Sequence, residues 1–397
     1  MKQQKERARR MEEQKWLIDK VIETSGVDFS WAPANNALSI LGFDASPDIA
    51  SVRAKAKRYV DIPREFERVA VRRQAIAKMA EQDGRFETAR ENYFAASILF
   101  GIGSWAYHED DNEENIAFHT RKTQCYDKFM QYAPHPIERV EVPFEGKSLP
   151  GILHVPRDAK RPLACVVLLR GMDALKEYAV PIYGSKFLVR GMAVLALDGP
   201  GQGESLMRKT RCTVDNYGRA GRAIMDYLVN RPEIDSTRIG LSGHSMGSFW
   251  GAQIAASDPR YKAVSVQAVC HEPGMNTIFN VASPTFKARY MWMAGYQDED
   301  EFDRFAQTLS LAGVGSKIRC PFLIVAGEDD ELSPITHSYD LYEEITAPKQ
   351  IVVYRGERHS LSGALGWQSL VADWLKDRLE GKPMQSQRMY VDAAGGK

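Results

Sequence analysis

The chain has 397 residues, 44% of them hydrophobic, and its 52 lysines and arginines are balanced by 52 aspartates and glutamates. This composition is typical of a soluble globular protein with one large or two medium domains. A net charge of zero provides no long-range field for phosphates or anionic lipids, so we expect neither a nucleic-acid nor a membrane partner. The N-terminus is charged from Lys2 onward and lacks the apolar core of a secretory signal, which predicts a cytoplasmic protein.

Residues 1–135 are predicted to form an α-helical domain. Charged stretches there carry apolar residues at intervals of three and four, as in "FERVAVRRQAIAKMAEQ". We expect this domain to act as a scaffold or lid, and direct contact with substrate is the open alternative. Its amphipathic N-terminal helix also suits a homodimer contact, although a solvated or intramolecular helix would show the same pattern.

Residues 136–384 are predicted to form an α/β domain with a mostly parallel, doubly wound sheet. Pro134 and Pro136 end the helical pattern, and the chain then alternates short apolar runs such as "LACVVLL" and "PFLIVAG" with stretches of helical length. Residues 272–316 are expected to be a helical insert that caps the active site or packs against the N-terminal helices. Residues 385–397 are expected to be a C-terminal tail.

The motif "GHSMG" identifies Ser245 as a candidate nucleophile. Ser245 follows the apolar strand "RIGLSG" and precedes a helical stretch, so the chain must turn sharply at the serine. Gly243 and Gly247 leave room for that turn, which exposes the hydroxyl above the N-terminus of the helix. The motif alone is a modest signal and needs partner residues.

Asp330 and His359 are the expected partners of Ser245. Each follows an apolar strand, Asp330 in "GEDDELSP" and His359 in "GERHS", so that Ser, Asp and His stand in this chain order at the ends of successive strands. A histidine oriented by a carboxylate is the usual base for a serine nucleophile. Asp329 is the competing carboxylate, and the distance from Gly327 favours Asp330.

Two backbone N–H groups are expected to form an oxyanion hole. One belongs to Met246, directly after the nucleophile, and the other to Met172, in the loop where Gly171 allows a close backbone approach. Arg170 precedes that glycine where esterases often have histidine. The charged residues that follow favour a salt-bridged turn over substrate contact: Asp173, Lys176 and Glu177.

Other segments carry weaker signals. "LALDGPGQGES", residues 195–205, has the glycines of a phosphate loop but not the register, so we interpret it as a loop after a strand of a hydrolase core. Glu272 could support the histidine, touch substrate or form a loop salt bridge. Tyr290 and Trp292 suit either an apolar pocket or the core. The acidic run 108–115 and the scattered cysteines lack metal-ligand spacing, and no cofactor or metal is expected.

The segments "GHSMG", "DGPGQGES", "GEDDELSP" and "GERHS" together resemble the α/β-hydrolase superfamily over residues 137–380. The helical first domain, "LPGILHVP" and "RGMDALKE" narrow the resemblance to one branch. It contains fermentation-respiration switch esterase-like proteins, 2,6-dihydroxypseudooxynicotine hydrolase and fungal polyketide-shortening hydrolases. The resemblance implies that Ser245, Asp330 and His359 are the triad, and that the helical domain closes the substrate pocket. It also places Glu272 where relatives have an extra carboxylate.

Because some members of that branch cleave a carbon–carbon bond next to a ketone, the resemblance implies a serine hydrolase acting on a small carbonyl substrate. The predicted reaction is carbon–carbon hydrolysis of a ketone, β-diketone or aromatic substrate in catabolism or polyketide processing. Glu272, Trp105 and Tyr107 could assist the leaving group. The alternatives are a carboxylesterase for small acyl esters and, in another class, a non-catalytic regulatory or binding protein on a hydrolase scaffold.

Overall fold

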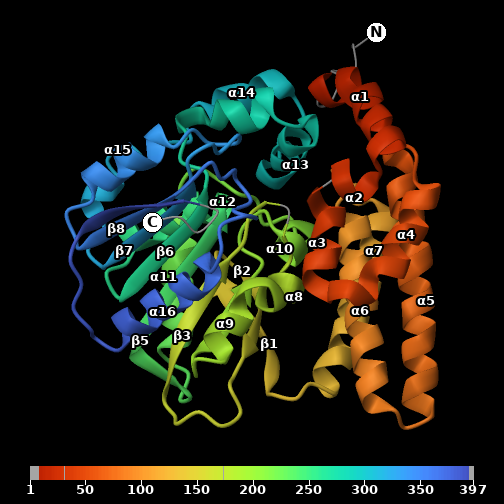
Figure 1. The fold of residues 1–397 in the computed structure, drawn as a ribbon, viewed down its shortest axis with the longest axis horizontal. Helices are drawn as coiled ribbons and strands as arrows, with labels where there is room; N and C mark the ends of the chain where they lie inside the picture. The colour runs from red at the N-terminus through yellow and green to blue at the C-terminus, as the bar shows by residue number, and fades with distance from the viewer. Residues whose placement is uncertain (1–8, 31, 173, 393–397) are drawn as a thin grey trace. The chain divides into compact units, whose positions relative to one another are not determined.

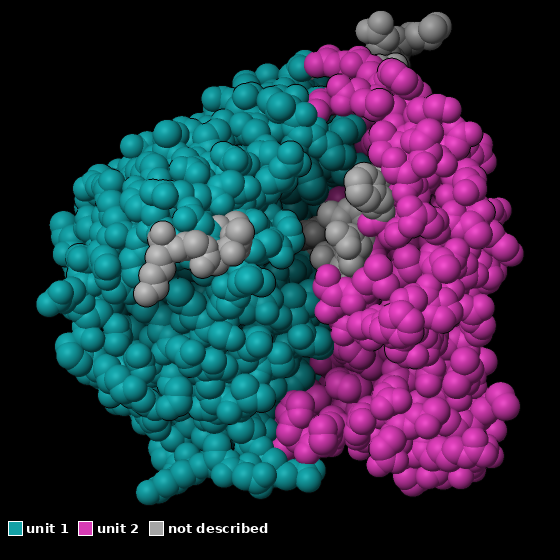
Figure 2. Space-filling model, viewed as in Figure 1, with its two compact units in different colours: residues 1–8, 139–397 teal, residues 9–138 magenta. Residues whose placement is uncertain are grey.

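The computed structural model describes residues 9–30, 32–172 and 174–392, and the chain divides into two compact units, residues 9–138 and 139–397 (Figure 2). The sequence predicted a domain boundary after residue 135, and the structure divides the chain after Glu138. The ends of the predicted helical domain and tail, residues 1–8 and 393–397, lie outside the described residues, as does Asp173. No described helix is long and apolar enough to cross a membrane.

Up to Gln131, the regular elements of the first unit in its described residues are all helices (Figure 1). Its elements are α1 Arg9–Ser25, α2 Val27–Ser30, α3 Ala32–Leu41, η1 Gly42–Ala45, α4 Ser46–Lys55, η2 Tyr59–Asp61, α5 Ile62–Gln82, α6 Phe86–Ser104 and α7 Glu113–Gln131. The three long helices α5, α6 and α7 pack against one another. Local sequence signals start them: Pro63 stands in the first turn of α5, and the Asn112 side chain accepts the Asn115 N–H at the start of α7.

The second unit is built on one nine-stranded sheet in the order β1-β2-β4-β3-β5-β6-β7-β8-β9. Its strands are β1 Ile137–Phe144, β2 Lys147–His154, β3 Leu163–Leu169, β4 Ala193–Leu197, β5 Ile234–Ser245, β6 Ala263–Val269, β7 Phe322–Gly327, β8 Lys349–Arg355 and β9 Gln387–Asp392. From β4 to β9 all neighbouring strands are parallel, and β2 pairs antiparallel with β4. The predicted mostly parallel α/β fold is therefore confirmed.

Helices cover both faces of this sheet (Figure 1). They are α8 Lys176–Ala179, η3 Val180–Gly184, α9 Ser185–Leu188, α10 Gly203–Met207, α11 Asn216–Leu228, α12 Met246–Ser257, α15 Thr336–Glu344 and α16 Trp367–Leu379. Alternate residues of β3 belong to two separate cores: Val167 packs in the core that includes α11 and α12, and Val166 in the core that includes α9 and α16. Because both faces of the sheet are buried, inner strands such as β3 are apolar along their whole length.

Two further segments of the sequence prediction, residues 272–316 and 385–397, also belong to this unit. The predicted insert at 272–316 is helical and lies between β6 and β7, and its predicted capping of the active site stays a prediction. Its elements are η4 Pro273–Met275, η5 Thr277–Val281, α13 Pro284–Ala294, α14 Glu299–Ala306 and η6 Gly315–Lys317. The predicted tail at 385–397 is wrong over residues 387–392, because these form β9 and extend the sheet beside β8.

Candidate active site

Ser245 occupies a strained turn between β5 and α12. Its backbone angles are φ 57° and ψ −125°, a conformation that non-glycine residues rarely adopt and that costs about 1–3 kcal/mol. A Cβ atom at Gly243 would lie 2.2 Å from the Gly247 carbonyl oxygen, and one at Gly247 would lie 2.3 Å from the Leu169 carbonyl oxygen. Both flanking positions therefore require glycine, as the sequence predicted.

The structure brings Ser245, His359 and Asp330 together. His359 Nε2 lies 2.9 Å from Ser245 Oγ, and His359 Nδ1 lies 2.9 Å from Asp330 Oδ2. An ionised carboxylate can only accept hydrogen bonds, so the Asp330 contact places the histidine hydrogen on Nδ1, which donates to Asp330. The Nε2 lone pair is then directed at the serine hydroxyl. The three side chains come from the carboxyl ends of β5, β7 and β8, where ligands bind in parallel sheets.

Asp330 is fixed in place by its own loop. Its Oδ1 accepts the backbone N–H groups of Leu332 and Ser333 at 2.9 and 3.0 Å, and its side chain is fully buried. The competing carboxylate, Asp329, is exposed, and its N–H donates to the Glu357 carbonyl. The structure thus distinguishes Asp330, which contacts His359, from the adjacent Asp329, whereas the sequence could compare the two acids only by their distance from Gly327.

Cys270 is a neighbour of the serine that sequence reasoning missed. Its sulfur lies 3.7 Å from Ser245 Oγ, and its N–H donates to Ser248 Oγ on α12 at 2.8 Å. It directly follows β6, so the parallel arrangement places it at the same sheet edge as the serine. Strand-end position was the signal that could have identified it.

The two expected oxyanion donors stand at the ends of neighbouring strands. Met246 is the first residue of α12, and Met172 follows β3, which pairs with β5 in register Leu169 to Gly243. The side chains of both methionines are buried in the core, so their contribution to the site would come from the backbone. An N–H at a helix start is a donor with no intrahelical partner.

Arg170 lies in a buried cluster with His244, next to the nucleophile. Its guanidinium stacks 4.2 Å from the ring centre of Tyr183, whose hydroxyl lies 3.0 Å from His244 Nε2. Burial, together with the nearby charges of Arg170 and His359, holds the pKa of His244 well below its usual range. His244 is thus a neutral packing residue beneath the turn.

The other predicted site residues make local contacts. The Glu272 carboxylate accepts the N–H and the hydroxyl of Thr277, the first residue of η5, at 2.8 and 3.0 Å. A role of Glu272 toward the histidine or the substrate stays a prediction. Tyr290 is fully buried among Phe279 and Phe302, with its hydroxyl 3.5 Å from Cys212 Sγ. These contacts place Tyr290 in the core.

The remaining aromatic residues are also engaged within their own units. Trp292 packs under the Arg289 guanidinium at 4.9 Å. In the helical unit, Trp105 is buried beside His108, and the Tyr107 hydroxyl donates to Glu114 at 2.6 Å. Burial and that carboxylate raise the pKa of Tyr107. Within the described residues, no three His, Cys, Asp or Glu side chains gather as metal ligands.

Comparisons with known proteins show which proteins this chain is similar to. A family model described as FrsA-like esterase matches residues 62–338. The alpha/beta hydrolase xenA of Xenoacremonium sinensis is 29% identical over 250 residues, which make up 59% of this chain and only 57% of that relative. The 2,6-dihydropseudooxynicotine hydrolase of Paenarthrobacter nicotinovorans is 25% identical over 326 residues, or 81% of this chain and 83% of the relative.

A solved structure shares the whole architecture. The crystal structure of a 2,6-dihydroxy-pseudo-oxynicotine hydrolase aligns with a TM-score of 0.76 at 24% identity, covering 89% of this chain and 98% of the other. At this identity the match shows the fold alone. Together with the sequence matches it confirms the predicted superfamily and branch.

Proposed function

The chain belongs to the FrsA-like esterase family and is therefore a hydrolase, and we propose that it uses Ser245 as nucleophile, His359 as base and Asp330 to orient His359. One observation carries this proposal: the unbroken chain of hydrogen-bond distances from Asp330 Oδ2 through His359 to Ser245 Oγ, each 2.9 Å. A serine hydroxyl becomes an effective nucleophile when such a base removes its proton.

The first half of the proposed reaction acylates the enzyme. Ser245 Oγ attacks the substrate carbonyl carbon while its proton moves to His359 Nε2. The carbonyl oxygen becomes an oxyanion, which accepts hydrogen bonds from the N–H groups of Met172 and Met246. When this intermediate collapses, the bond to the leaving group breaks, and the leaving group takes the proton from His359.

The second half frees the enzyme. Water gives a proton to His359 and attacks the acyl carbon, again forming an oxyanion at the same donors. Collapse then breaks the bond to Ser245 Oγ, which recovers the proton from His359, and a carboxylic acid leaves. No metal or cofactor takes part in either half of this scheme.

The leaving group decides between the two reaction classes. We propose carbon–carbon hydrolysis of a small ketone, β-diketone or aromatic substrate, in which the leaving carbanion is stabilised as an enolate by a neighbouring carbonyl. The similarity to a hydrolase of 2,6-dihydropseudooxynicotine over 81% of this chain supports this choice. The family description, FrsA-like esterase, favours the second candidate, a carboxylesterase whose leaving group is an alkoxide.

A substrate panel distinguishes these classes. The wild type, Ser245→Ala and a control, Ser360→Ala, would be assayed with p-nitrophenyl acyl esters and aryl β-diketones. Ser360 is an exposed serine in the same loop as His359, so its loss should leave turnover unchanged. We expect faster cleavage of the diketones, and loss of all turnover only in Ser245→Ala. Faster cleavage of the esters would assign a carboxylesterase.

A wild type that turns over neither class and is not modified at Ser245 by a fluorophosphonate would contradict the proposal. That result would instead favour the non-catalytic binding protein. The aligned triad argues against this alternative, because a binding surface has no need for a nucleophile, a base and an orienting acid in hydrogen-bond contact.

A further inference from the structure

The loop after β3 needs an external support. It carries the proposed oxyanion donor Met172, and its described residues between β3 and α8, 170–172 and 174–175, form neither helix nor strand. An oxyanion donor lowers a barrier only if it is already in position when the charge develops. The described residues on either side of residue 173 show what holds this loop.

The first support is the Gln202 side chain. Its Nε2 donates to two successive carbonyls of the loop, those of Arg170 at 3.0 Å and Gly171 at 2.8 Å. Its Oε1 accepts the Gly199 N–H at 3.0 Å and the Tyr217 hydroxyl at 3.2 Å, which fixes the amide orientation. Gln202 is 1% exposed, so water does not compete for these bonds.

These contacts determine the direction of the loop N–H groups. A trans peptide is planar, so its C=O and N–H point in opposite directions. Because the Gly171 carbonyl is held on Gln202, the Met172 N–H of the same peptide points away from Gln202. The Arg170 carbonyl also lies against the nucleophile turn, since a Cβ atom at Gly247 would be 3.1 Å from its oxygen. The Gln202 side-chain amide therefore holds the loop after β3 in one position against the nucleophile turn.

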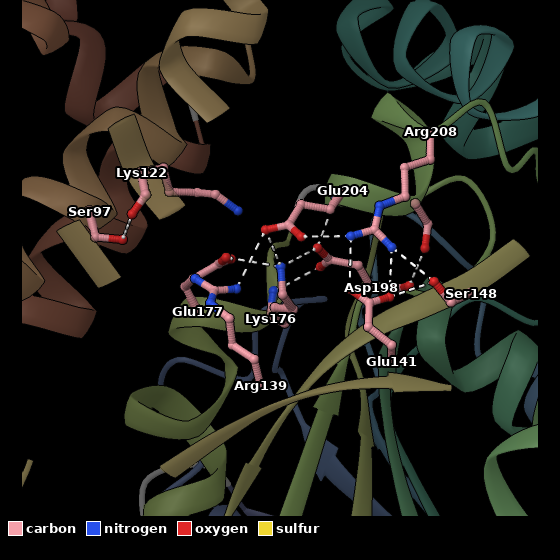
Figure 3. Close-up of polar contacts among 11 residues, drawn as sticks. Ser97, Lys122, Arg139, Glu141, Ser148, Lys176, Glu177, Asp198, Glu204 and Arg208 are labelled. Carbon is pink, nitrogen blue, oxygen red and sulfur yellow. Dashed lines mark hydrogen bonds and ion pairs between the residues drawn. The ribbon is translucent and has the colours of Figure 1, made fainter. Parts of the chain in front are cut away.

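The second support lies at the far end of the loop (Figure 3). The Lys176 N–H donates to Asp198 Oδ1 at 2.9 Å. The Lys176 ammonium is fully buried and contacts Glu177, Asp198 and Glu204 at 2.9–3.0 Å. Burial alone would lower the pKa of Lys176, but the three carboxylates outweigh it and raise the pKa.

Both supports come from one short segment after β4. Asp198, Gln202 and Glu204 belong to the run "DGPGQGE", which forms the loop after that strand and the start of α10. We propose that this segment clamps residues 170–172 and 174–176, and that Gln202 is a positioning residue that holds the Met172 N–H in the oxyanion hole. This inference rests on the proposed function of Ser245 as the nucleophile.

The test removes the Gln202 donor and leaves the triad intact. Gln202→Met has a similar length and donates no hydrogen bond, and Gln202→Glu keeps an oxygen for Gly199 and Tyr217. The matched control is Gln253→Met, which removes another amide, on α12, that donates to a backbone carbonyl, that of Val214 at 2.7 Å. Thermal unfolding of each full-length variant checks that it folds.

Two kinetic readouts separate positioning from general support of the fold. We expect kcat on the preferred substrate to fall about 100-fold in Gln202→Met and in Gln202→Glu, with KM changed less than about twofold. The inhibition constant of an aryl trifluoromethyl ketone, which forms an oxyanion on the serine, should rise by the same factor. Gln253→Met should leave both values within about twofold of the wild type.

The outcomes distinguish the two proposals. If the wild type shows Ser245-dependent turnover but both Gln202 variants keep kcat and inhibitor affinity, the clamp is wrong and the nucleophile assignment stands. Equal losses in the Gln202 and Gln253 variants would also overturn the clamp, because the effect would then be general. Absence of Ser245-dependent turnover in the wild type would overturn both proposals.

Discussion

Asp330 controls which nitrogen of His359 carries the proton. Its buried carboxylate contacts His359 Nδ1 at 2.9 Å and is itself held by two backbone N–H groups. In Asp330→Asn the side-chain amide can present an N–H to Nδ1, which moves the histidine proton to Nε2 and removes the base. We expect kcat to fall about 10³–10⁴-fold, measured as steady-state turnover of the preferred substrate.

Asp329→Asn is the matched control for that variant. Asp329 is the adjacent acid and is exposed, so its neutralisation should change kcat less than about twofold. Equal losses in the two variants would contradict the assignment of Asp330, because a general change in loop charge would then explain both.

At the residue scale, the sequence allowed the proximity of site residues to be predicted where a residue type, a strand end and a chain order coincided. Ser245, Asp330 and His359 were predicted in this way, and the structure brings them together. Gln202 was missed because an amide in a glycine-rich loop has no sequence pattern that points to its tertiary partners. For Glu272 the sequence left three roles open, support of the histidine, substrate contact or a loop salt bridge, and its position after a strand also suits the contact with Thr277 that it forms.

At the element scale, the nucleophile turn depends on the close approach of α12 to the end of β3. A Cβ atom at Gly247 would meet the Leu169 carbonyl, which is backbone and cannot move aside alone. We expect Gly247→Ala to lower the free energy of unfolding by about 1–3 kcal/mol and to reduce kcat, because the turn or the strand end must shift. Urea unfolding and turnover measure the two effects.

The control for this substitution lies one helical turn further along α12. The close contacts of a Cβ atom at Gly251 would be the side chains of Leu241 and Val266 at 3.1 and 3.3 Å, which can adjust by a few tenths of an ångström. The nearest backbone atom, the Gly243 Cα, would be at 4.0 Å, an ordinary contact distance. Gly251→Ala should therefore keep its turnover. If Gly247→Ala also kept wild-type turnover, the argument for glycine at this position would be wrong.

Strand β9 shows why some elements could not be predicted. Its sequence, "QRMYVD", has an apolar run of only three residues, 389–391, and its side chains are half-buried or exposed at the sheet edge. Pairing with β8 in register Ile351 to Arg388 holds it in place, and that contact is tertiary. The inner strands β3, β6 and β7 were predictable because burial on both faces demands continuous apolar sequence.

At the scale of the whole molecule, composition and alternation predicted a helical part followed by an α/β part, and the chain does divide into two compact units. The predicted homodimer stays a prediction. Trp16 and Leu17 are exposed on α1, where such a contact was expected. The five cysteines lie within the described residues, are buried and form no disulfide there.

Acid should destabilise the folded protein through its buried histidines. Burial lowers the pKa of His271 to about 3, so between about pH 6.5 and 3 the unfolded chain binds a proton that the folded chain excludes. The stabilisation from neutral His271 is therefore present above pH 6.5 and is lost as the pH falls through that window. The loss amounts to about 1.4 kcal/mol per pH unit.

His271→Phe removes this proton uptake. The free energy of unfolding, measured in urea between pH 6.5 and 4, should then fall less steeply with acidification than in the wild type. Ser338→Ala removes the 2.9 Å contact to His271 Nδ1 and keeps the histidine, so it should lower stability but preserve the slope. A wild-type slope in His271→Phe would contradict the prediction.

The central claim is that Ser245 is the nucleophile, and the mass of the protein after treatment with a fluorophosphonate tests it most directly. We predict that the wild type gains one phosphonyl group, which peptide mapping places on Ser245, and that Ser245→Ala and heat-unfolded wild type gain none. An unmodified wild type, or modification that persists in Ser245→Ala, would contradict the claim.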